Sequence, residues 1–449
     1  MCIKDSSKAV SSIAATRLAN HLKGFGIEEQ AGSTPGKGFP DATFTLKTAL
    51  QTLREHDQES WVLFVDLVKA YDTVNREMLW KILKILGVPD NLIEVLKKLY
   101  TDVTINLKVG ENLEQFLSTS GVKQGDNLAP VLFIFVIHAV SNTLDKKWEF
   151  KTPDFRWYPD TQAGNPRGQL RGTKHFNKGT KFSFFKSYYV DDTAFILLSR
   201  EELITAAKLI VSHFRRFGLT IHTGAKSKNE DSKTEAMHFP KPGQESSVAD
   251  MEDIEIDEDR FMSFCLKFKY LGTFFMPELN DTADITERIS QARKLFNSMN
   301  RQVLSNKRIP IDIRRRLYQA IVVNIGLWGS ESWALKEEDR SKLETFHHNC
   351  LRRMCKWTMW DIAEKRITNE KVRRTAANSP TMESMMEVRR CRWLSKLSVM
   401  EKSRSPRQML GAWCPTPRPS GRPQQTIRHA YITTLKKLGF EQEKGQKGK

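Results

Sequence analysis

Two adjacent aspartates, Asp191 and Asp192, stand between two apolar, aromatic-rich runs in FSFFKSYYVDDTAFILLS, residues 182–199. The runs have the composition of buried strands, and the interruption predicts a strand, an Asp-Asp turn and a second strand. A buried carboxylate is costly unless a cation or several hydrogen bonds compensate it, and no basic residue adjoins the pair. The fold must therefore supply another way to neutralise two charges at the tip of a hairpin.

A third carboxylate, Asp66, ends the apolar run WVLFV at residues 61–65, which is typical of a buried strand. Magnesium would compensate all three acids, since it binds carboxylate oxygens and completes its shell with waters and substrate phosphates. Two such ions about 3.5–4 Å apart stabilise the attacking and leaving oxygens in phosphoryl transfer. The structural alternative is that Asp-Asp only forms a turn and that Asp66 only caps the next segment.

The charge of the chain favours a polyanionic partner. Its 449 residues hold 71 Lys and Arg against 53 Asp and Glu, a formal net charge of +18. Nucleic acid is the commonest such partner, and a generically basic surface is the alternative. With 39% hydrophobic and 28% charged residues, the composition excludes disorder over the whole length, and the length predicts two to four domains. No run of 18 apolar residues occurs, so we expect no transmembrane helix, and six cysteines without a C-x-x-C pair predict reduced thiols in an intracellular protein.

Hydrophobic periodicity predicts several helices. The helix after Asn75, an N-cap residue, should end at Gly87 and Pro89, and from Asp284 basic helices follow, one opened by Pro310 at its first position. This change of character indicates a domain boundary near residue 280. The other expected helices cover 8–23, 44–53, 128–140 (buried), 201–217 and 339–356, and the expected loops or irregular segments cover 31–43, 146–180 and 245–260.

Five segments in order resemble motifs A to E of a reverse transcriptase palm. They are LFVDLVKAYDTVN (63–75), GVKQGDNLAPVLF (121–133), YYVDD (188–192), FGLTIH with SKTEAMHF (217–222 and 232–239), and FKYLGTFF (268–275). Later segments, including LWGSESWAL and HHNCLRRMCKW, resemble the C-terminal half of LINE-type non-LTR retrotransposon polyproteins. The resemblance covers nearly the whole chain, and the ordered set of five motifs is far more specific than any one of them.

The resemblance implies an α+β right-hand polymerase with fingers, a palm bearing an antiparallel sheet, a helical thumb and a basic helical C-terminal extension. The expected limits are 1–60 for partial fingers, 61–279 for the palm with finger insertions, 280–360 for the thumb and 361–449 for the extension. The alignment also implies that the chain begins inside the fingers, so that it is N-terminally incomplete relative to the family.

The resemblance further implies the roles of the site residues. Asp66, Asp191 and Asp192 would hold two Mg²⁺ ions, with Mn²⁺ as the alternative ion, and the backbone carbonyl of Leu67 would join them. Lys233 would protonate the leaving pyrophosphate, with Lys226 and Lys228 as rivals. The primer grip would be formed by Phe268, Lys269, Tyr270, Leu271 and Gly272.

The incoming deoxynucleotide would meet a further set of residues. Tyr71 would act as a steric gate whose ring clashes with a 2′-hydroxyl, and Gln124 and Gly125 would touch the nucleotide. The fingers segment departs from the family pattern, because Thr34 stands where an arginine is usual. Lys37 would meet the triphosphate there, but as a point charge without the bidentate grip of arginine.

The function implied is RNA-directed DNA synthesis from dNTPs, with an RNA template and a DNA primer or target as partners and no membrane. The expected location is the nucleus, the cytoplasm or both, as a ribonucleoprotein. Two alternatives stay open. In the first, the chain is a catalytically silent retrotransposon remnant that at most binds RNA. In the second, it is an RNA-dependent RNA polymerase on the same palm, and the bulky Tyr71 argues against this one.

Overall fold

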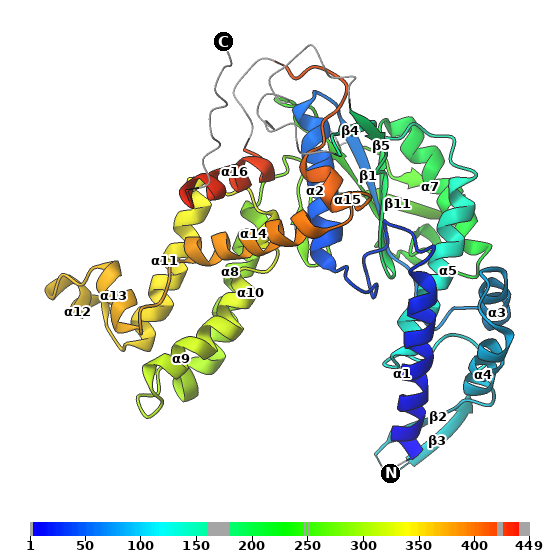
Figure 1. Cartoon of the computed structure of the whole chain (residues 1–449), viewed down its shortest axis with the longest axis horizontal. Helices are drawn as coiled ribbons and strands as arrows, with labels where there is room; N and C mark the ends of the chain where they lie inside the picture. Colours follow the sequence, from blue (N-terminus) through cyan, green and yellow to red (C-terminus); the bar gives the residue numbers. More distant parts are fainter. Residues whose placement is uncertain are drawn as a thin grey trace. The chain divides into compact units, whose positions relative to one another are not determined.

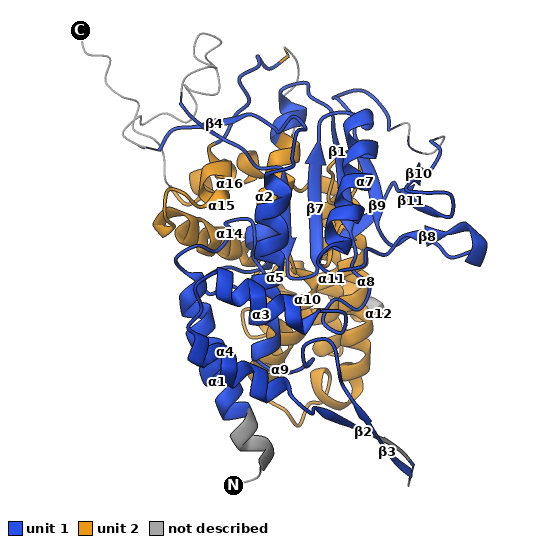
Figure 2. Ribbon diagram, turned by 90° about the vertical axis from the view of Figure 1, so that its right-hand side faces the viewer, with its two compact units in different colours: residues 1–42, 52–271, 412–418 blue, residues 43–51, 272–411, 419–449 orange. Residues whose placement is uncertain are grey.

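The computed structural model describes residues 3–110, 112–159, 179–246, 248, 251–419 and 425–439. The chain forms two compact units, shown in different colours in Figure 2. Unit 1 comprises residues 1–42, 52–271 and 412–418, and unit 2 comprises residues 43–51, 272–411 and 419–449. Helix α2 (Phe39–Glu55) contributes residues to both units.

The centre of unit 1 is a seven-stranded sheet with the order β10-β11-β9-β1-β7-β6, to which β8 is added beside β11. Strand β1 pairs antiparallel with both β7 and β9, whereas β9 and β11 pair parallel. The strands are β1 (Ser60–Val65), β6 (Lys186–Tyr189), β7 (Asp192–Leu197), β8 (Gly224–Ala225), β9 (Glu235–Phe239), β10 (Ile254–Glu255) and β11 (Arg260–Phe264).

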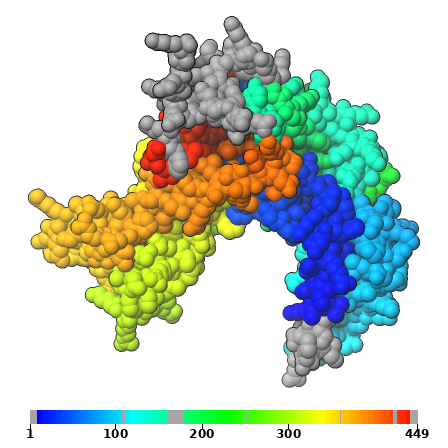
Figure 3. All heavy atoms as spheres, in the orientation of Figure 1, coloured from blue at the N-terminus to red at the C-terminus, as the bar shows by residue number. Residues whose placement is uncertain are grey.

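Helices and short hairpins complete unit 1. Helix α1 lies on its surface (Figure 3), and the ring of His21 is hydrogen-bonded to the backbone oxygen of Leu86 at 2.8 Å. The helices are α1 (Ile3–Leu22), α3 (Arg76–Ile85), α4 (Asp90–Tyr100), α5 (Leu128–Asp145) and α7 (Arg200–Arg215). The remaining strands are β2 (Thr104–Val109), β3 (Asn112–Leu117), β4 (Phe155–Trp157), β5 (Thr180–Phe182) and β12 (Phe268–Tyr270).

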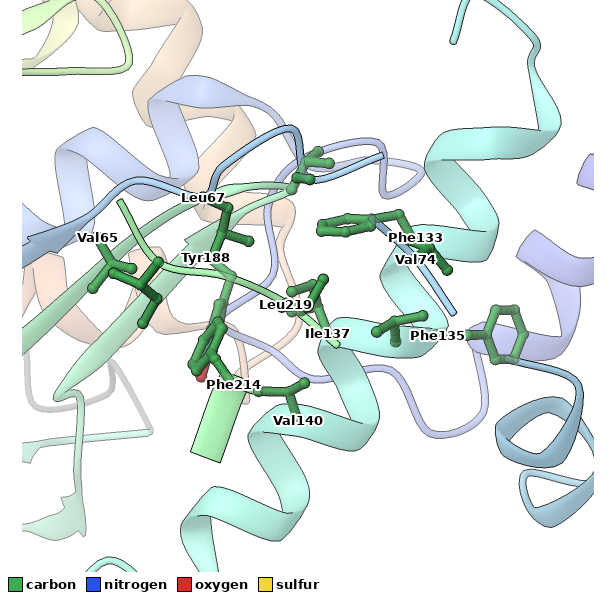
Figure 4. Close-up of a cluster of buried hydrophobic side chains, with 14 of the residues drawn as sticks. Val65, Leu67, Val74, Phe133, Phe135, Ile137, Val140, Tyr188, Phe214 and Leu219 are labelled. Carbon is green, nitrogen blue, oxygen red and sulfur yellow. The ribbon is translucent and has the colours of Figure 1, made fainter. Parts of the chain in front are cut away.

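The core of unit 1 lies under the end of β1, where the acidic residues emerge. Alternate residues of a strand face opposite sides of a sheet. Leu63 and Val65 accordingly join the cluster formed with α5 and α7, while Phe64 stacks on Phe268 with ring centroids 4.2 Å apart. Figure 4 shows this cluster, with Val65, Leu67, Val74, Phe133, Phe135, Ile137, Val140, Tyr188, Phe214 and Leu219 labelled.

Helix α5 confirms the buried helix predicted from residues 128–140. Among the described helices it is the one that is long and apolar enough to cross a bilayer by length and composition. Since 72% of it is buried inside the protein, as in the core helix of a soluble protein, this is weak support for a membrane span. Its apolar character is explained by packing against α1, α3 and α7.

Other local predictions are partly right. The α3 cap is confirmed, because the side chain of Asn75 accepts a hydrogen bond from the backbone N–H of Met78 at 2.9 Å. Helix α2 begins earlier than predicted, since Asp41 accepts from the N–H of Gly38 and Pro40 occupies the first turn. The expected loop at 146–180 contains β4 and the start of β5, and its residues 160–178 lie outside the described part.

Unit 2 is helical around a core that includes Tyr318 and Trp333, both fully buried. Figure 1 shows its helices, which follow β13 (Thr273–Phe275). They are α8 (Thr282–Met299), α9 (Ile311–Tyr318), α10 (Asn324–Gly326), α11 (Glu337–Met354), α12 (Met359–Glu364), α13 (Asn369–Thr375), α14 (Met382–Val399), α15 (Ser405–Leu410) and α16 (Ile427–Lys437). Pro310 is the N-cap residue of α9, so the prediction that it occupies the first position of this helix is wrong by one residue.

The compact units divide near the predicted change of character. The longest segment of unit 2, residues 272–411, begins a few residues before the boundary expected at 280. Within unit 2, one core includes both Ile285 and Met386, so it extends across the expected limit at residue 360. The separate roles of fingers, palm, thumb and basic extension stay a prediction.

Candidate active site

The sheet brings the three predicted acids to one end of two neighbouring strands. Asp66 directly follows β1, and Asp192 is the first residue of β7. Because Val65 lies opposite Thr193 in the antiparallel register, Asp66 and Asp192 emerge at the same edge. Asp191 occupies the turn between β6 and β7, whose register pairs Tyr189 with Asp192. The predicted Asp-Asp turn is thus displaced by one residue, and the turn consists of Val190 and Asp191.

The acidic groups affect one another electrostatically. Burial, followed by the charges of Asp191 and Asp66, raises the pKa of Asp192 to about 6. The pKa of Asp191 is also raised, first by burial and then by the charge of Asp66. Like charges in a half-buried site disfavour ionisation, and a cation reverses this effect. The metal-free protein therefore carries an unfavourable negative charge at this edge of the sheet.

The donor set suits a hard divalent cation, because all three side chains offer carboxylate oxygens. The backbone beside them is fixed: the N–H of Asp66 donates to Thr234 Oγ1 at 3.2 Å, and its carbonyl accepts from the N–H of His222 at 2.9 Å. Leu67, the predicted carbonyl ligand, follows directly and is buried. Over the described ranges, no three His, Cys, Asp or Glu side chains form a ready-made metal cage. The relation among the three acids that the structure shows is the effect of their like charges on one another.

A pocket of about 720 Å³ has Tyr71 in its lining. Its lining includes Tyr71, Gln124 and Gly125, the three residues predicted to meet the nucleotide base and sugar. The ring of Tyr71 stacks on Phe133 with centroids 5.2 Å apart. Burial, and then the charge of Asp191, raises the pKa of Tyr71 to about 12, so its hydroxyl stays protonated at neutral pH. Tyr71 thus lines the pocket and is also affected by the charge of Asp191.

Sequence reasoning missed several residues of this pocket. Ser33, Asp126, Asn127, Ala129, Pro130 and Val131 also line it. Helix α1 holds the adjoining loop, since Ser11 donates to Asp126 at 3.0 Å and Asn127 donates to Ser12 at 2.9 Å. The polar run G-D-N within the predicted motif B was the available signal, because loop residues beside a buried helix often carry function.

The loop that bears Gln124 depends on Gly121. Its φ of +76° lies in the left-handed region, and a Cβ there would come within 2.7 Å of the Asp72 backbone. This close approach allows the N–H of Val122 to donate to the carbonyl of Tyr71 at 2.7 Å. The predicted gate residue and the loop opposite it are therefore held together by their backbones.

Replacing Gly121 with alanine is expected to destabilise the protein strongly. Left-handed backbone costs an alanine roughly 1–2 kcal/mol, and the overlap with Asp72 adds about 1–3 kcal/mol. Gly243 is a matched control, because its φ of +81° is similar but no described atom lies within 4 Å of the position that a Cβ would take there. Urea unfolding should show a larger decrease in the free energy of unfolding for Gly121→Ala than for Gly243→Ala. Equal decreases would contradict the close packing described.

Two of the four predicted lysines, Lys37 and Lys226, are paired with acids other than the three at the sheet. Lys37 forms an ion pair with Glu28 at 2.8 Å and also donates to the Glu28 carbonyl at 2.7 Å. Lys226 pairs with Glu255 at 2.7 Å, whereas Lys228 and Lys233 are exposed. Thr34, in the place of the usual arginine, donates to the carbonyl of Gly32 at 3.2 Å. To bind a triphosphate, Lys37 would have to leave Glu28, so its role stays a prediction. The role of Lys233 also stays a prediction.

The predicted primer grip is partly anchored in unit 1. Phe268 stacks on Phe64, and the hydroxyl of Tyr270 donates to Ser187 Oγ at 3.3 Å. Ser187 lies in β6, so this bond ties the segment to the strand that leads into the acidic turn. Lys269 is exposed, Leu271 has a φ of +50°, and Gly272 is the first residue of that part of unit 2. Contact with a primer stays a prediction.

Comparison with known proteins agrees with this geometry. The family model "Reverse transcriptase (RNA-dependent DNA polymerase)" matches residues 1–273, more than half of the chain. The chain belongs to the reverse transcriptase family, which confirms the predicted right-hand polymerase fold, and the R2 relatives described next support the resemblance to non-LTR enzymes. Enzymes of this family generally use divalent metal.

Two curated relatives come from retrotransposable elements. The chain is 27% identical over 138 residues to the Pol polyprotein of type-2 element R2DM from Drosophila melanogaster, a match covering 30% of the chain and 13% of the relative. It is 32% identical over 85 residues to the Pol polyprotein of a type-1 element R2 from Popillia japonica, covering 19% of the chain and 14% of the relative. The chain thus matches only a small part of each relative.

Solved structures of telomerase from Candida tropicalis also align. The apo enzyme matches 91% of this chain and 62% of its own at 12% identity, with a TM-score of 0.40. A complex with a fragment of telomeric RNA matches 89% of this chain and 56% of its own, also at 12% identity, with a TM-score of 0.42.

Proposed function

We propose that this chain is an RNA-directed DNA polymerase of a non-LTR retrotransposon, which adds dNTPs to a primer 3′-hydroxyl on an RNA template. The observation that carries the proposal is the meeting of Asp66, Asp191 and Asp192 at one sheet edge, beside a pocket lined by Tyr71 and Gln124. Membership of the reverse transcriptase family supports the same reaction.

The carboxylates of Asp66, Asp191 and Asp192 would hold two divalent cations, Mg²⁺ or Mn²⁺, with the Leu67 carbonyl as a further ligand. When bound, such ions lower the barrier to attack by the 3′-hydroxyl on the α-phosphate and compensate the charge of the leaving pyrophosphate. Tyr71 would lie under the sugar and exclude a 2′-hydroxyl, and Gln124 and Gly125 would touch the incoming nucleotide.

The partners proposed are an RNA template, a DNA primer or target, and dNTPs. The net charge of +18 supports contact with polyanions, and such binding should weaken as salt rises because counterions are released. We propose that the protein works inside the cell as a ribonucleoprotein, in the nucleus, the cytoplasm or both.

A catalytically silent remnant is the second candidate. The observation that favours it is the fingers loop, where Thr34 replaces an arginine and Lys37 is paired with Glu28. Purified protein should be given a primed RNA template, Mg²⁺ and either dNTPs or rNTPs. DNA complementary to the template is the expected product. RNA binding without any product would favour the silent remnant, and use of rNTPs as readily as dNTPs would refute the steric-gate role of Tyr71.

A further inference from the structure

A short segment of unit 1, residues 29–32, runs along strand β6 beside the acidic turn. The N–H of Tyr188 donates to the carbonyl of Glu29 at 3.0 Å, and the N–H of Ala31 donates to the carbonyl of Tyr188 at 2.9 Å. These bonds form a parallel bridge between Gln30 and Tyr188. The segment therefore continues the sheet beyond β6, two residues before the turn.

The side chain of Gln30 reaches from this bridge into the turn itself. Its amide oxygen accepts from the N–H of Gly32 at 2.9 Å and from the N–H of Val190 at 3.1 Å. Both partners are donors, so the oxygen assignment follows from the bonds. Gln30 is only 1% exposed, and its amide nitrogen has no hydrogen-bond partner among the described residues. Among the described residues, the amide oxygen therefore makes all the hydrogen bonds of this buried side chain.

The turn needs such support. Val190 has a φ of +63°, a conformation that is a genuine outlier for a β-branched residue and persists only when its surroundings enforce it. Gly32 packs directly on it, since a Cβ at Gly32 would lie 2.6 Å from Val190 Cγ2 and 2.9 Å from its backbone nitrogen. Asp191 and Asp192 follow Val190, so the backbone conformation of Val190 determines where their carboxylates point.

We propose that Gln30 is a positioning residue, which locks the left-handed turn at Val190 and thereby presents Asp191 and Asp192 to the cations. The inference rests on the proposed function for its catalytic meaning, but the hydrogen bond itself can be tested without activity. Residues that orient metal ligands in this way typically contribute 10- to 100-fold to metal affinity or activity.

Two variants separate the acceptor role from general stability. Gln30→Met keeps the length of the side chain but removes the oxygen. Gln51→Met is the matched control, because Gln51 is also buried and its amide oxygen accepts from the N–H of Ile427 at 3.0 Å, within unit 2.

Hydrogen exchange of the peptide covering residues 187–193 is the first measurement, and the Mg²⁺ concentration for half-maximal dNTP incorporation is the second. Gln30→Met should speed exchange in this peptide and raise the half-saturating Mg²⁺ concentration roughly 10- to 100-fold. Gln51→Met should leave both unchanged.

The possible outcomes are distinct. The proposal is overturned if Gln30→Met matches the wild type or if Gln51→Met has the same effect on the peptide. If the wild type incorporates no dNTP, the proposed function fails, and hydrogen exchange still decides whether Gln30 holds the turn.

Discussion

Changing Asp192 to asparagine is expected to lower dNTP incorporation about 10²- to 10³-fold while making the metal-free protein more stable at neutral pH. The loss of activity follows because asparagine offers a neutral amide where a cation needs a carboxylate. The gain in stability follows from the raised pKa of Asp192, about 6, which shows that folding disfavours its ionised form. The two effects therefore have opposite signs.

The direction with pH can be derived from the shift. A carboxyl group whose pKa is raised on folding binds its proton more tightly in the folded protein, so its penalty is absent below about pH 4 and develops as the pH rises through 6. The wild type should lose stability over this interval, and Asp192→Asn should lose less. After allowance for solvent screening, the free energies of unfolding of Asp192→Asn and the wild type should differ at pH 7.5 by on the order of 1 kcal/mol.

Thermal unfolding at pH 4 and pH 7.5 in EDTA measures this effect, and single-turnover primer extension measures the activity. Asp257→Asn is the control, because hydrogen bonds from Arg260 hold the pKa of Asp257 down to about 2, the opposite direction. The control should keep its activity and gain no stability. An Asp192→Asn variant that is less stable at pH 7.5 than the wild type would contradict the electrostatic description of the site.

Replacing Tyr71 with alanine is expected to reduce discrimination against rNTPs roughly 10- to 200-fold, the range for losing a steric contact in a pocket. The ring lines the pocket proposed to hold the nucleotide and is held in place by stacking on Phe133. Without it, space opens where a 2′-hydroxyl would lie. Since Gln124 and Gly125 are unchanged, dNTP incorporation should fall less than discrimination does.

The Tyr71→Phe variant separates the effect of the size of the ring from the effect of its hydroxyl group. It retains the ring and the stacking but removes the hydroxyl, whose pKa is affected by the charge of Asp191. The ratio of kcat/KM for dNTP and rNTP, measured with the same primed RNA, should stay near the wild-type value in Tyr71→Phe. Loss of discrimination in both variants would assign the selection to the hydroxyl and refute a steric gate.

Much of the fold could be predicted because its signals are local. WVLFV, the cap at Asn75 and the apolar run at 128–140 each specify their own element, and the structure confirms all three. The acids were found for the same reason, since Asp66, Asp191 and Asp192 each follow or interrupt a buried run. What joins them is the antiparallel register of β1 and β7.

The rest depends on contacts between distant segments. The turn is displaced by one residue because Val190 adopts a left-handed conformation, which nothing in the sequence YYVDD indicates. Its cause lies about 160 residues earlier, in Gln30 and Gly32. Likewise, the family alignment suggested that Lys37 meets the triphosphate, but the fold brings Glu28 to its ammonium group.

The central claim is that the three carboxylates make this chain a template-directed DNA polymerase. The most direct measurement is incorporation of dNTPs on a primed RNA template, comparing the wild type with an Asp191→Ala/Asp192→Ala variant at several Mg²⁺ concentrations. We predict Mg²⁺-dependent, template-complementary DNA from the wild type and none from the variant, with equal RNA binding by both. Equal incorporation by the two proteins, or none by the wild type, would contradict the claim.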